Sequence, residues 1–305
     1  MIAKLRKTLY GLRRSPKLFT DGLADHLISK GYTRLTSDPC IYRKDKGGES
    51  IIFNTHVDDF ACFPTCESMF TELVHDLQEK YRITTSDNLD GHLGMRVNKY
   101  ADGAVGLSQP KQLEFKLAGL EDNSNGASTP MATDFNDDEQ SDSPRCDLTK
   151  YQSLLGSLIH ILKTRSDVAF AISRMSSRTQ VSTEKDMEAL RRICRYLLRT
   201  RKYELIFSPS AQAQREAVIT MFAWADAAYQ THADSKGHSG YCMGIGDGAS
   251  GKVIAGSEKQ ALNTLSACES EIHSAVSGTT NVMWLRDLLD EPLIFFPHYS
   301  YFFSH

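Results

Sequence analysis

The spacing of apolar residues changes twice along this 305-residue chain and divides it into three blocks. Before about residue 120, short apolar runs typical of strands alternate with helical stripes such as the one over residues 69–77. Residues 149–202 repeat their apolar side chains at steps of three and four, which predicts helices. From residue 203 strand patterns return, and a long amphipathic helix follows them. The pattern predicts an α+β chain in two lobes.

Charge is distributed unevenly over these blocks. Lys and Arg total 35 against 38 Asp and Glu, so the net charge of −3 excludes nucleic-acid binding through overall charge alone. Basic residues gather locally, with eight Lys or Arg against two Asp in residues 1–34 and seven against two acids in residues 185–202. Residues 134–147 hold six acids, one Arg and few large apolar side chains. Because burial cannot offset the entropy of ordering such a segment, we expect a mobile acidic linker over residues 121–148.

Cysteine content and hydropathy indicate in which cellular compartment we expect the protein. Seven cysteines, an odd number without a regular framework, indicate reduced thiols and an intracellular protein, cytoplasmic or nuclear. No apolar run approaches the roughly 20 residues needed to span a membrane. The first seven residues lack the apolar core of a signal peptide, so we expect no membrane partner.

Two adjacent carboxylates interrupt the apolar runs near residue 58. The segment His56-Val57-Asp58-Asp59-Phe60 lies between two strand-like stretches, which predicts a hairpin with both aspartates at its tip. Side chains that converge there would repel each other unless a divalent cation neutralised them. Paired carboxylates holding Mg²⁺ are what phosphoryl and nucleotidyl transfer require. The alternative is an ordinary solvated turn, in which Asp is common.

Longer motifs surround this pair. Residues 5–16 read LRKTLYGLRRSP and resemble the “LkkaLYGLkqaPr” segment of copia-type (Pseudoviridae) retrotransposon reverse transcriptases. Val57-Asp58-Asp59 resembles the “YVDD” box of that family, with His56 where tyrosine is usual. Further stretches that resemble the family, in order, are 93–97, 107–109, 129–131, 151–158, 164–171 and 195–200. The resemblance covers about residues 4–290.

The last block resembles the RNase H domain of the same family. Residues 224–229 are similar to its first catalytic strand, which implies that Asp226 binds metal. Residues 265–273 are similar to its acidic helix, which implies a second metal-binding carboxylate from Glu271, with Glu269 as second choice. The alternative for both glutamates is that acids are ordinary near a helix N-terminus, where they favour the macrodipole. The resemblance leaves His232 and His238 as hydrogen-bonding residues of a loop.

The resemblance also implies a domain organisation. A reverse transcriptase palm and thumb are expected over residues 1–120, the acidic linker over 121–148 and a helical connection over 149–202. A partial RNase H-like domain, with a mixed sheet and a long helix, is expected over 203–291. Residues 292–305 match nothing in the family, and we expect this tail to expose aromatic side chains.

By resemblance, the chain is a fragment of an RNA-directed DNA polymerase and RNase H that copies RNA into DNA by Mg²⁺-dependent nucleotidyl transfer. The implied partners are an RNA template, a DNA primer, RNA–DNA hybrid and dNTPs, and the sequence assigns no oligomeric state. The basic helix is implied to run along the duplex, with a solvated helix face as the alternative. Its implied phosphate contacts are Arg191, Arg192, Arg195 and Arg199.

Each implied metal site is expected to lack one carboxylate. The family takes a further aspartate from a strand before the LYGL motif, but no acid precedes Asp21. The RNase H domain takes a third from a strand after the long helix, but no acid follows Glu291. Because positioning of Mg²⁺ supplies most of the catalysis, we expect little or no activity from the chain alone. Two alternatives stay open: a non-catalytic nucleic-acid-binding remnant and a poorly folded relic.

Overall fold

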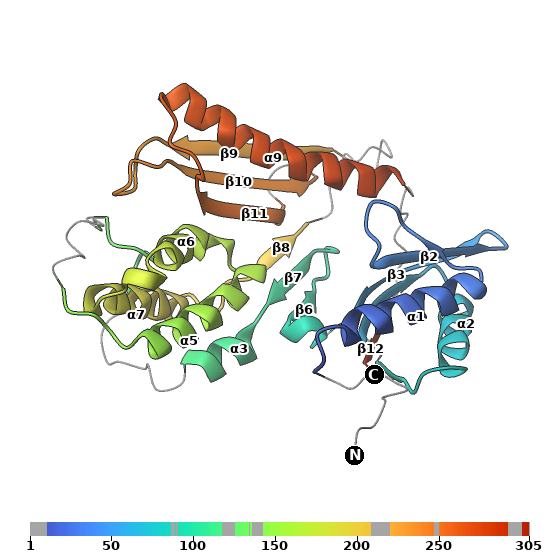
Figure 1. Cartoon of the computed structure of the whole chain (residues 1–305). Coiled ribbons are helices and arrows are strands. Elements are labelled where there is room, and N and C mark those ends of the chain that lie inside the picture. The colour runs from blue at the N-terminus through green and yellow to red at the C-terminus, as the bar shows by residue number, and fades with distance from the viewer. Residues whose placement is uncertain are drawn as a thin grey trace, which may run out of the picture. The chain divides into compact units, whose positions relative to one another are not determined.

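The computed structural model describes residues 11–86, 89, 91–117, 126–133, 135, 143–208, 220–246 and 250–291, and the backbone of 301–304 (Figure 1). The internal contacts divide the chain into two compact units, residues 1–93 with 284–305, and residues 94–283. Each unit has its own hydrophobic core.

The first unit is built on one antiparallel sheet. Its strands lie in the order β1-β2-β3-β4-β12-β5, and every neighbouring pair is antiparallel. The elements are α1 (Ser15–Ser29), β1 (Thr33–Arg34), β2 (Ile41–Lys46), β3 (Glu49–His56), β4 (Asp59–Pro64), α2 (Glu67–Gln78), β5 (Thr84–Ser86) and β12 (Tyr301–Ser304). A short 3₁₀ turn, η1 (His92–Gly94), follows β5.

Both helices of this unit pack on one face of the sheet. Pro16 stands in the first turn of α1, where proline is tolerated, and Gly31 follows the helix with φ +85°, a conformation that glycine adopts without strain. Leu27 of α1, Leu73 of α2 and Phe53 of β3 are fully buried in one core. This packing fixes the β3–β4 hairpin against two helices.

The second unit contains two three-stranded antiparallel sheets and a block of helices. One sheet is formed by β6 (Arg96–Lys99), β7 (Val105–Ser108) and β8 (Leu205–Phe207). The other has β10 (His238–Ile245) between β9 (Met221–Ala228) and β11 (Lys252–Lys259). The helices are α3 (Pro110–Leu117), α5 (Leu148–Ile159), η2 (His160–Lys163), η3 (Ser166–Val168), α6 (Ala169–Ser177), η4 (Thr179–Val181), α7 (Glu184–Arg199) and α9 (Ala267–Asp290), whose residues from 284 on belong to the first unit.

The helical block has the core that its apolar periodicity predicts. Leu158 of α5, Met175 of α6 and Leu190 of α7 are fully buried in one cluster. At the start of α7, Thr183 and Asp186 form a capping box, in which each side chain accepts the other residue's backbone N–H. No helix in the described part of the chain has the length and hydropathy to cross a membrane.

Parts of the predicted linker pack against this block. Residues 136–142, which hold four of its eight acids, lie outside the described residues. Met131, Phe135 and Cys146 contact the helical core, and Arg192 of α7 donates to the Thr129 carbonyl. The expectation of a segment without burial is therefore wrong for the described part of 121–148, because its few apolar side chains attach it to the helices.

The predicted unmatched tail contributes a strand. Tyr301–Ser304, from the segment 292–305, form β12 between β4 and β5, with Phe302 opposite both Ala61 and Ser86. The exposure of aromatic side chains expected for this tail stays a prediction, since the structure describes the backbone of these four residues. Their backbone pairs with the edge of β4, which would otherwise leave its N–H and C=O groups unpaired.

The predicted mixed sheet of residues 203–291 is also corrected. Its described strands β9, β10 and β11 are all antiparallel. The loops that join them, residues 229–237 and 246–251, are too short for the crossover that a parallel pair needs. The sequence therefore predicts the strands correctly and their directions only in part.

Candidate active site

The β3–β4 hairpin carries the two adjacent carboxylates at its tip. His56 and Asp59 lie directly opposite each other, so Val57 and Asp58 form a two-residue turn. Val57 has a φ of +59°. Residues branched at Cβ rarely adopt this region, which costs about 1–3 kcal/mol. The predicted hairpin is therefore present, and its tip holds a strained backbone.

Burial and like charge act together on Asp59. Its side chain and that of Asp58 are both half-buried. Burial and the negative charge of Asp58 raise the pKa of Asp59, and the side chains of His92 and His56 partly oppose this rise. Within the described residues, neither carboxylate forms an ion pair with a Lys or Arg. Among the described residues, the tip thus concentrates negative charge that the His56 and His92 side chains partly offset.

No sequence pattern singles out His92 as a member of this environment. It is buried in η1, where Leu93 and Gly94 adopt φ values of +52° and +75°. Its place directly before the Leu93-Gly94-Met95 motif is the signal that could have found it. The turn brings a residue more than thirty positions along the chain into electrostatic reach of Asp59.

A second set of predicted carboxylates lies on β9 and α9. Asp226 stands within β9, and Glu269 and Glu271 stand near the start of α9. The helix packs on this sheet through small polar side chains, since the buried Ser274 hydroxyl donates to the Asp226 carbonyl at 2.7 Å. The structure therefore brings the backbone of Asp226 against the helix that carries both glutamates.

The two glutamates of α9 differ in their contacts. The Glu269 carboxylate accepts the Leu265 N–H at 2.7 Å, and the Glu269 N–H donates to the Ser266 hydroxyl at 3.2 Å. Bonds of this kind are common for an acidic residue at a helix N-terminus, where the backbone N–H groups have no partner within the helix. Glu271 is exposed and makes no hydrogen bond or ion pair with a described residue. Glu271 is therefore the carboxylate whose oxygens stay available.

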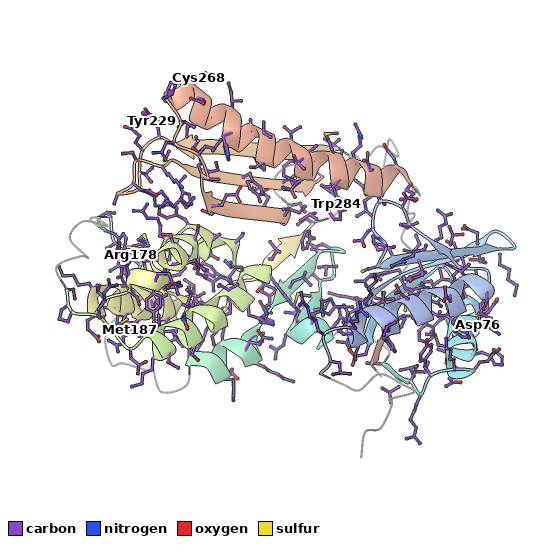
Figure 2. All side chains as sticks on the ribbon, viewed as in Figure 1. Asp76, Arg178, Met187, Tyr229, Cys268 and Trp284 are labelled. Atoms are coloured by element: carbon purple, nitrogen blue, oxygen red, sulfur yellow. The ribbon has the colours of Figure 1, made fainter. Side chains whose placement is uncertain are left out.

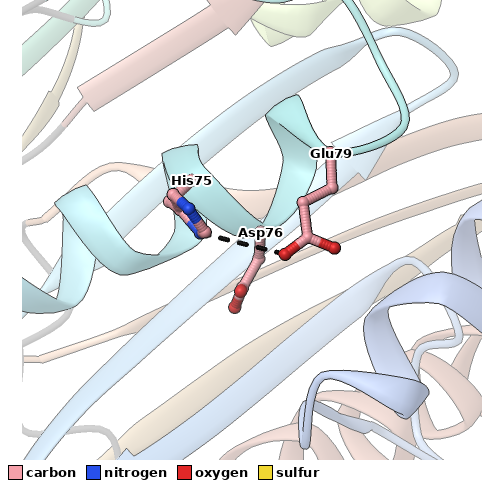
Figure 3. Close-up of side chains that lie close together, drawn as sticks. All are labelled: His75, Asp76 and Glu79. Atoms are coloured by element: carbon pink, nitrogen blue, oxygen red, sulfur yellow. Dashed lines mark ion pairs between the residues drawn. The ribbon is translucent and has the colours of Figure 1, made fainter.

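A cluster of possible metal ligands lies elsewhere, at the end of α2. Among the described residues, one group of possible ligands has its ligand atoms within 4.8 Å of one another (Figure 3). It consists of His75, Asp76 and Glu79. Lys30 binds Glu79 and lies 4.0 Å from Asp76, and Lys44 lies 3.4 Å from Asp76. Because these lysines already neutralise the carboxylates, we interpret the cluster as an ion-pair network.

Each arginine of the predicted phosphate-contact surface has a partner within the chain. The partners are Glu188 for Arg191 and Arg195 at 3.5 and 2.7 Å, the Thr129 hydroxyl for Arg192 at 3.0 Å, and the Gly126 carbonyl for Arg199 at 3.1 Å. These bonds attach α7 to the segment before α5 and lower the charge that its exposed face presents. The face resembles a solvated helix surface more closely than a free basic stripe.

Two of the family-like motifs meet in space. Arg165, from the motif over residues 164–171, is buried and donates to the Asp167 carboxylate at 2.9 and 2.7 Å. It also donates to the Thr200 carbonyl at 3.1 Å, at the end of the motif over residues 195–200. The Tyr196 hydroxyl of that motif donates to Asp167 at 2.8 Å. These motifs therefore hold the helical block together.

Comparison with known proteins identifies relatives of the chain. Residues 1–133 match the family model described as reverse transcriptase (RNA-dependent DNA polymerase). The chain is 25% identical over 292 residues to the retrovirus-related Pol polyprotein from transposon RE1 of Arabidopsis thaliana. It is 27% identical over 305 residues to the retrovirus-related Pol polyprotein from transposon TNT 1-94 of Nicotiana tabacum.

These matches cover 95% of this chain but 19% and 22% of the two polyproteins, so the chain spans about a fifth of their length. No solved structure matches the chain significantly. The similarity extends through both compact units. Residues 1–133 thus match the reverse transcriptase family model, and the chain as a whole is similar to Pol polyproteins of copia-type retrotransposons.

Proposed function

We propose that this chain is the part of a retrotransposon RNA-directed DNA polymerase that carries two of its metal-binding carboxylates. The observation that carries the proposal is the strained β3–β4 tip, which presents Asp58 and Asp59 within the segment that matches the reverse transcriptase family. On this proposal the unit up to Leu93 is palm, and α3 begins the thumb.

The donor set of the tip fits Mg²⁺. Carboxylate oxygens are the hard ligands that this ion prefers. Burial first, and then the charge of Asp58, raise the pKa of Asp59, and a divalent cation between the two carboxylates would remove their repulsion. When bound, Mg²⁺ supplies neutralisation of the charge on the transferred phosphoryl group. The two aspartates would hold and orient the ion, and the packing of the hairpin on α1 and α2 would fix their position.

The tip by itself offers two carboxylates. Among the described residues, no further His, Cys, Asp or Glu completes a group of three ligand atoms within 4.8 Å that includes Asp58 and Asp59. Two protein ligands leave most positions around Mg²⁺ to water and hold it with little geometric precision. We therefore expect weak Mg²⁺ binding and little or no primer extension by this chain alone.

A second site is proposed for removal of the RNA strand from RNA–DNA hybrid. The β9–β10–β11 sheet with α9 would be an RNase H-like domain, with Asp226 and Glu271 as its metal-binding residues. The bond from Ser274 to the Asp226 carbonyl supports this assignment, because it holds α9 against the strand. Engagement of Glu269 in capping favours Glu271 over Glu269.

Metal binding tests the polymerase site directly. Mn²⁺ is titrated into the wild-type chain, into Asp58→Asn/Asp59→Asn and into a control, Asp45→Asn, with free Mn²⁺ measured by electron paramagnetic resonance. Asp45 is an exposed acid of β2 that pairs with Arg43. We expect the double variant to lose a site that the control retains. Equal Mn²⁺ binding by all three proteins contradicts the proposal.

Primer extension measures the activity separately. The chain is incubated with an RNA template, a DNA primer, dNTPs and Mg²⁺, and we expect little extension. Strong extension that Asp58→Asn abolishes would confirm the site and reject the expected inactivity. Extension that Asp58→Asn leaves unchanged would reject the site itself.

A further inference from the structure

A cavity of about 540 Å³ opens in the second unit between the β6–β7–β8 sheet, α3 and the end of α7. Its apolar part is formed by Leu113 and Leu117 of α3 and Leu198 of α7. Leu113 and Leu117 are buried members of the helical core, so this part of the wall is fixed. The volume lies within the range of about 300–1,000 Å³ usual for ligand sites.

Three basic side chains line this cavity. They are Arg96 of β6 and the two residues that follow α7, Arg201 and Lys202. All three are exposed, and none makes a hydrogen bond or ion pair with a described residue. This distinguishes them from Arg191 and Arg195 of α7, which share Glu188. The cavity therefore gathers three cations that no described carboxylate pairs with.

The acidic residues of the cavity do not supply that anion. Glu204 accepts from the Asn98 side chain at 2.5 Å, from the Tyr100 hydroxyl at 2.5 Å and from the Ser108 hydroxyl at 3.4 Å. Its carboxylate is thus bound to β6 and β7. Glu114 is exposed on α3 and makes no ion pair with a described residue. The three cations outnumber these two carboxylates.

We propose that this cavity binds the phosphate backbone of a nucleic-acid strand, with Arg96, Arg201 and Lys202 on the phosphates and an adjoining sugar or base over the leucines. This inference rests on the proposed function, since it names the surface that holds the polymerase's nucleic-acid substrate. Guanidinium groups suit it because their N–H groups can grip two phosphate oxygens at once. The phosphate surface is then the cavity and not the outer face of α7.

Binding of a fluorescent RNA–DNA hybrid tests this assignment by anisotropy over a series of KCl concentrations. The test variant is Arg96→Gln/Arg201→Gln/Lys202→Gln, and the matched control is Arg191→Gln/Arg192→Gln/Arg195→Gln, which removes the same charge. We expect the test variant to bind at least about tenfold more weakly and to reduce the salt slope by about 3, because each lost phosphate contact lowers the slope by about 1. The control should change affinity by less than about threefold.

A charge-conserving variant and a competing nucleotide serve as further controls of the binding assay. Arg96→Lys/Arg201→Lys keeps the charge and should restore most of the lost affinity, which a folding defect would not allow. A nucleoside monophosphate should compete with the hybrid only weakly, and competition as strong as that of a strand would overturn the assignment to a polymer. An equal or larger loss in the α7 control, or no loss in the test variant, would overturn the inference while leaving the proposed function intact. Absence of hybrid binding by the wild-type chain would reject both.

Discussion

The helical block and the hairpin tip differ in how their carboxylates are neutralised. In the helical block, Arg178 (labelled in Figure 2) donates through its guanidinium to the fully buried Asp186 carboxylate at 2.5 and 3.2 Å. The Thr183 backbone N–H donates to the same carboxylate at 2.9 Å. At the hairpin tip, Asp58 and Asp59 have no Lys or Arg partner among the described residues, and one raises the pKa of the other. A carboxylate is thus neutralised by an arginine in the helical block, whereas two carboxylates repel each other at the hairpin tip.

On the proposed function, this difference separates structural acids from metal-binding acids. A buried carboxylate bound by Arg and backbone N–H groups is a fixed part of the fold, and an added cation gains nothing there. Two carboxylates that repel each other on a strained turn destabilise the folded state, and a divalent cation would relieve that cost. The tip is therefore where the chain has most to gain from a metal ion.

The largest expected effect comes from removing the buried Asp186 carboxylate, which Arg178 neutralises. Asp186→Ala leaves the Arg178 guanidinium buried without its carboxylate and removes the capping box, so we expect a loss of about 3–5 kcal/mol in the free energy of unfolding. Urea denaturation followed by circular dichroism measures it. Glu184→Ala, an exposed acid in the same turn, should cost less than about 0.5 kcal/mol. A loss below about 1 kcal/mol for Asp186→Ala would show that the pair is not needed.

A chain of hydrogen bonds holds two buried histidines neutral in the second unit. Arg174 can only donate, so Nδ1 of His232 must accept its N–H, at 2.7 Å. Nε2 of His232 then donates to Nδ1 of His238 at 3.0 Å, and Nε2 of His238 donates to the Ser257 hydroxyl at 2.8 Å. The expectation that both histidines make hydrogen bonds is confirmed, and the direction of these bonds requires both rings to be neutral.

This chain of bonds predicts the second-largest effect, on acid stability. Burial, with the charge of Arg174, lowers the pKa of His232 to about 3 and that of His238 to about 4. Both values lie below the unfolded pKa of about 6.5, so stability is fully present above pH 6.5 and is lost as the pH falls toward these values. Between pH 6.5 and pH 5 the loss is about 2 kcal/mol for each histidine.

Urea denaturation at pH 7.5 and pH 5 measures this loss. The variant His232→Asn/His238→Gln should lose less stability than the wild type over that interval, even where its stability at pH 7.5 is already lower. An identical change with pH in both proteins would show that these rings do not carry the acid sensitivity. Other groups of the chain contribute equally to both proteins, so the difference isolates the pair.

Local patterns of the sequence predict the hairpin tip well and its surroundings poorly. Asp58 and Asp59 are neighbours between two apolar runs, so a short-range pattern is enough to place both at a turn. The proximity of His92 depends on how η1 folds back toward the hairpin, and the partner of Arg192 depends on where residue 129 lies. Neither leaves a periodic signal in the sequence, because each contact joins segments more than thirty residues apart.

Contacts between segments distant in sequence also explain where else the structure differs from the sequence-based expectations. β6 begins only at Arg96, because the preceding residues 92–94 form a turn in which Leu93 and Gly94 have positive φ values. β12 pairs with β4 across more than two hundred residues, and no local pattern specifies such a partner. In contrast, the apolar steps of α5, α6 and α7 predict their core, since each helix buries one continuous face.

A smaller effect tests the backbone strain of Val57 at the hairpin tip. Val57→Gly allows the φ of +59° without a clash, and after the extra chain entropy of glycine we expect a gain of about 1 kcal/mol in stability. Val181 is exposed to the same extent, 45% against 44%, and its φ is not positive, so Val181→Gly should lose about 0.5–1 kcal/mol. Thermal denaturation measures both. A loss for Val57→Gly would mean that the tip is not strained.

The smallest expected effect tests the repulsion itself. Asp59 has a folded pKa above its unfolded value, so its ionisation destabilises the fold above that pKa, and the cost vanishes as the pH falls below about 3.9. Asp58→Asn removes part of this cost and should lower the pKa of Asp59 and add less than about 1 kcal/mol of stability at pH 7. An NMR titration of the Asp59 carboxyl carbon measures the pKa, with Asp45→Asn as the control. Saturating Mg²⁺ should lower the wild-type pKa in the same direction, because it also removes the repulsion. A pKa that responds to Asp58→Asn and not to Mg²⁺ would show two acids that repel without binding metal, and the distinction between structural and functional acids would then fail at the tip.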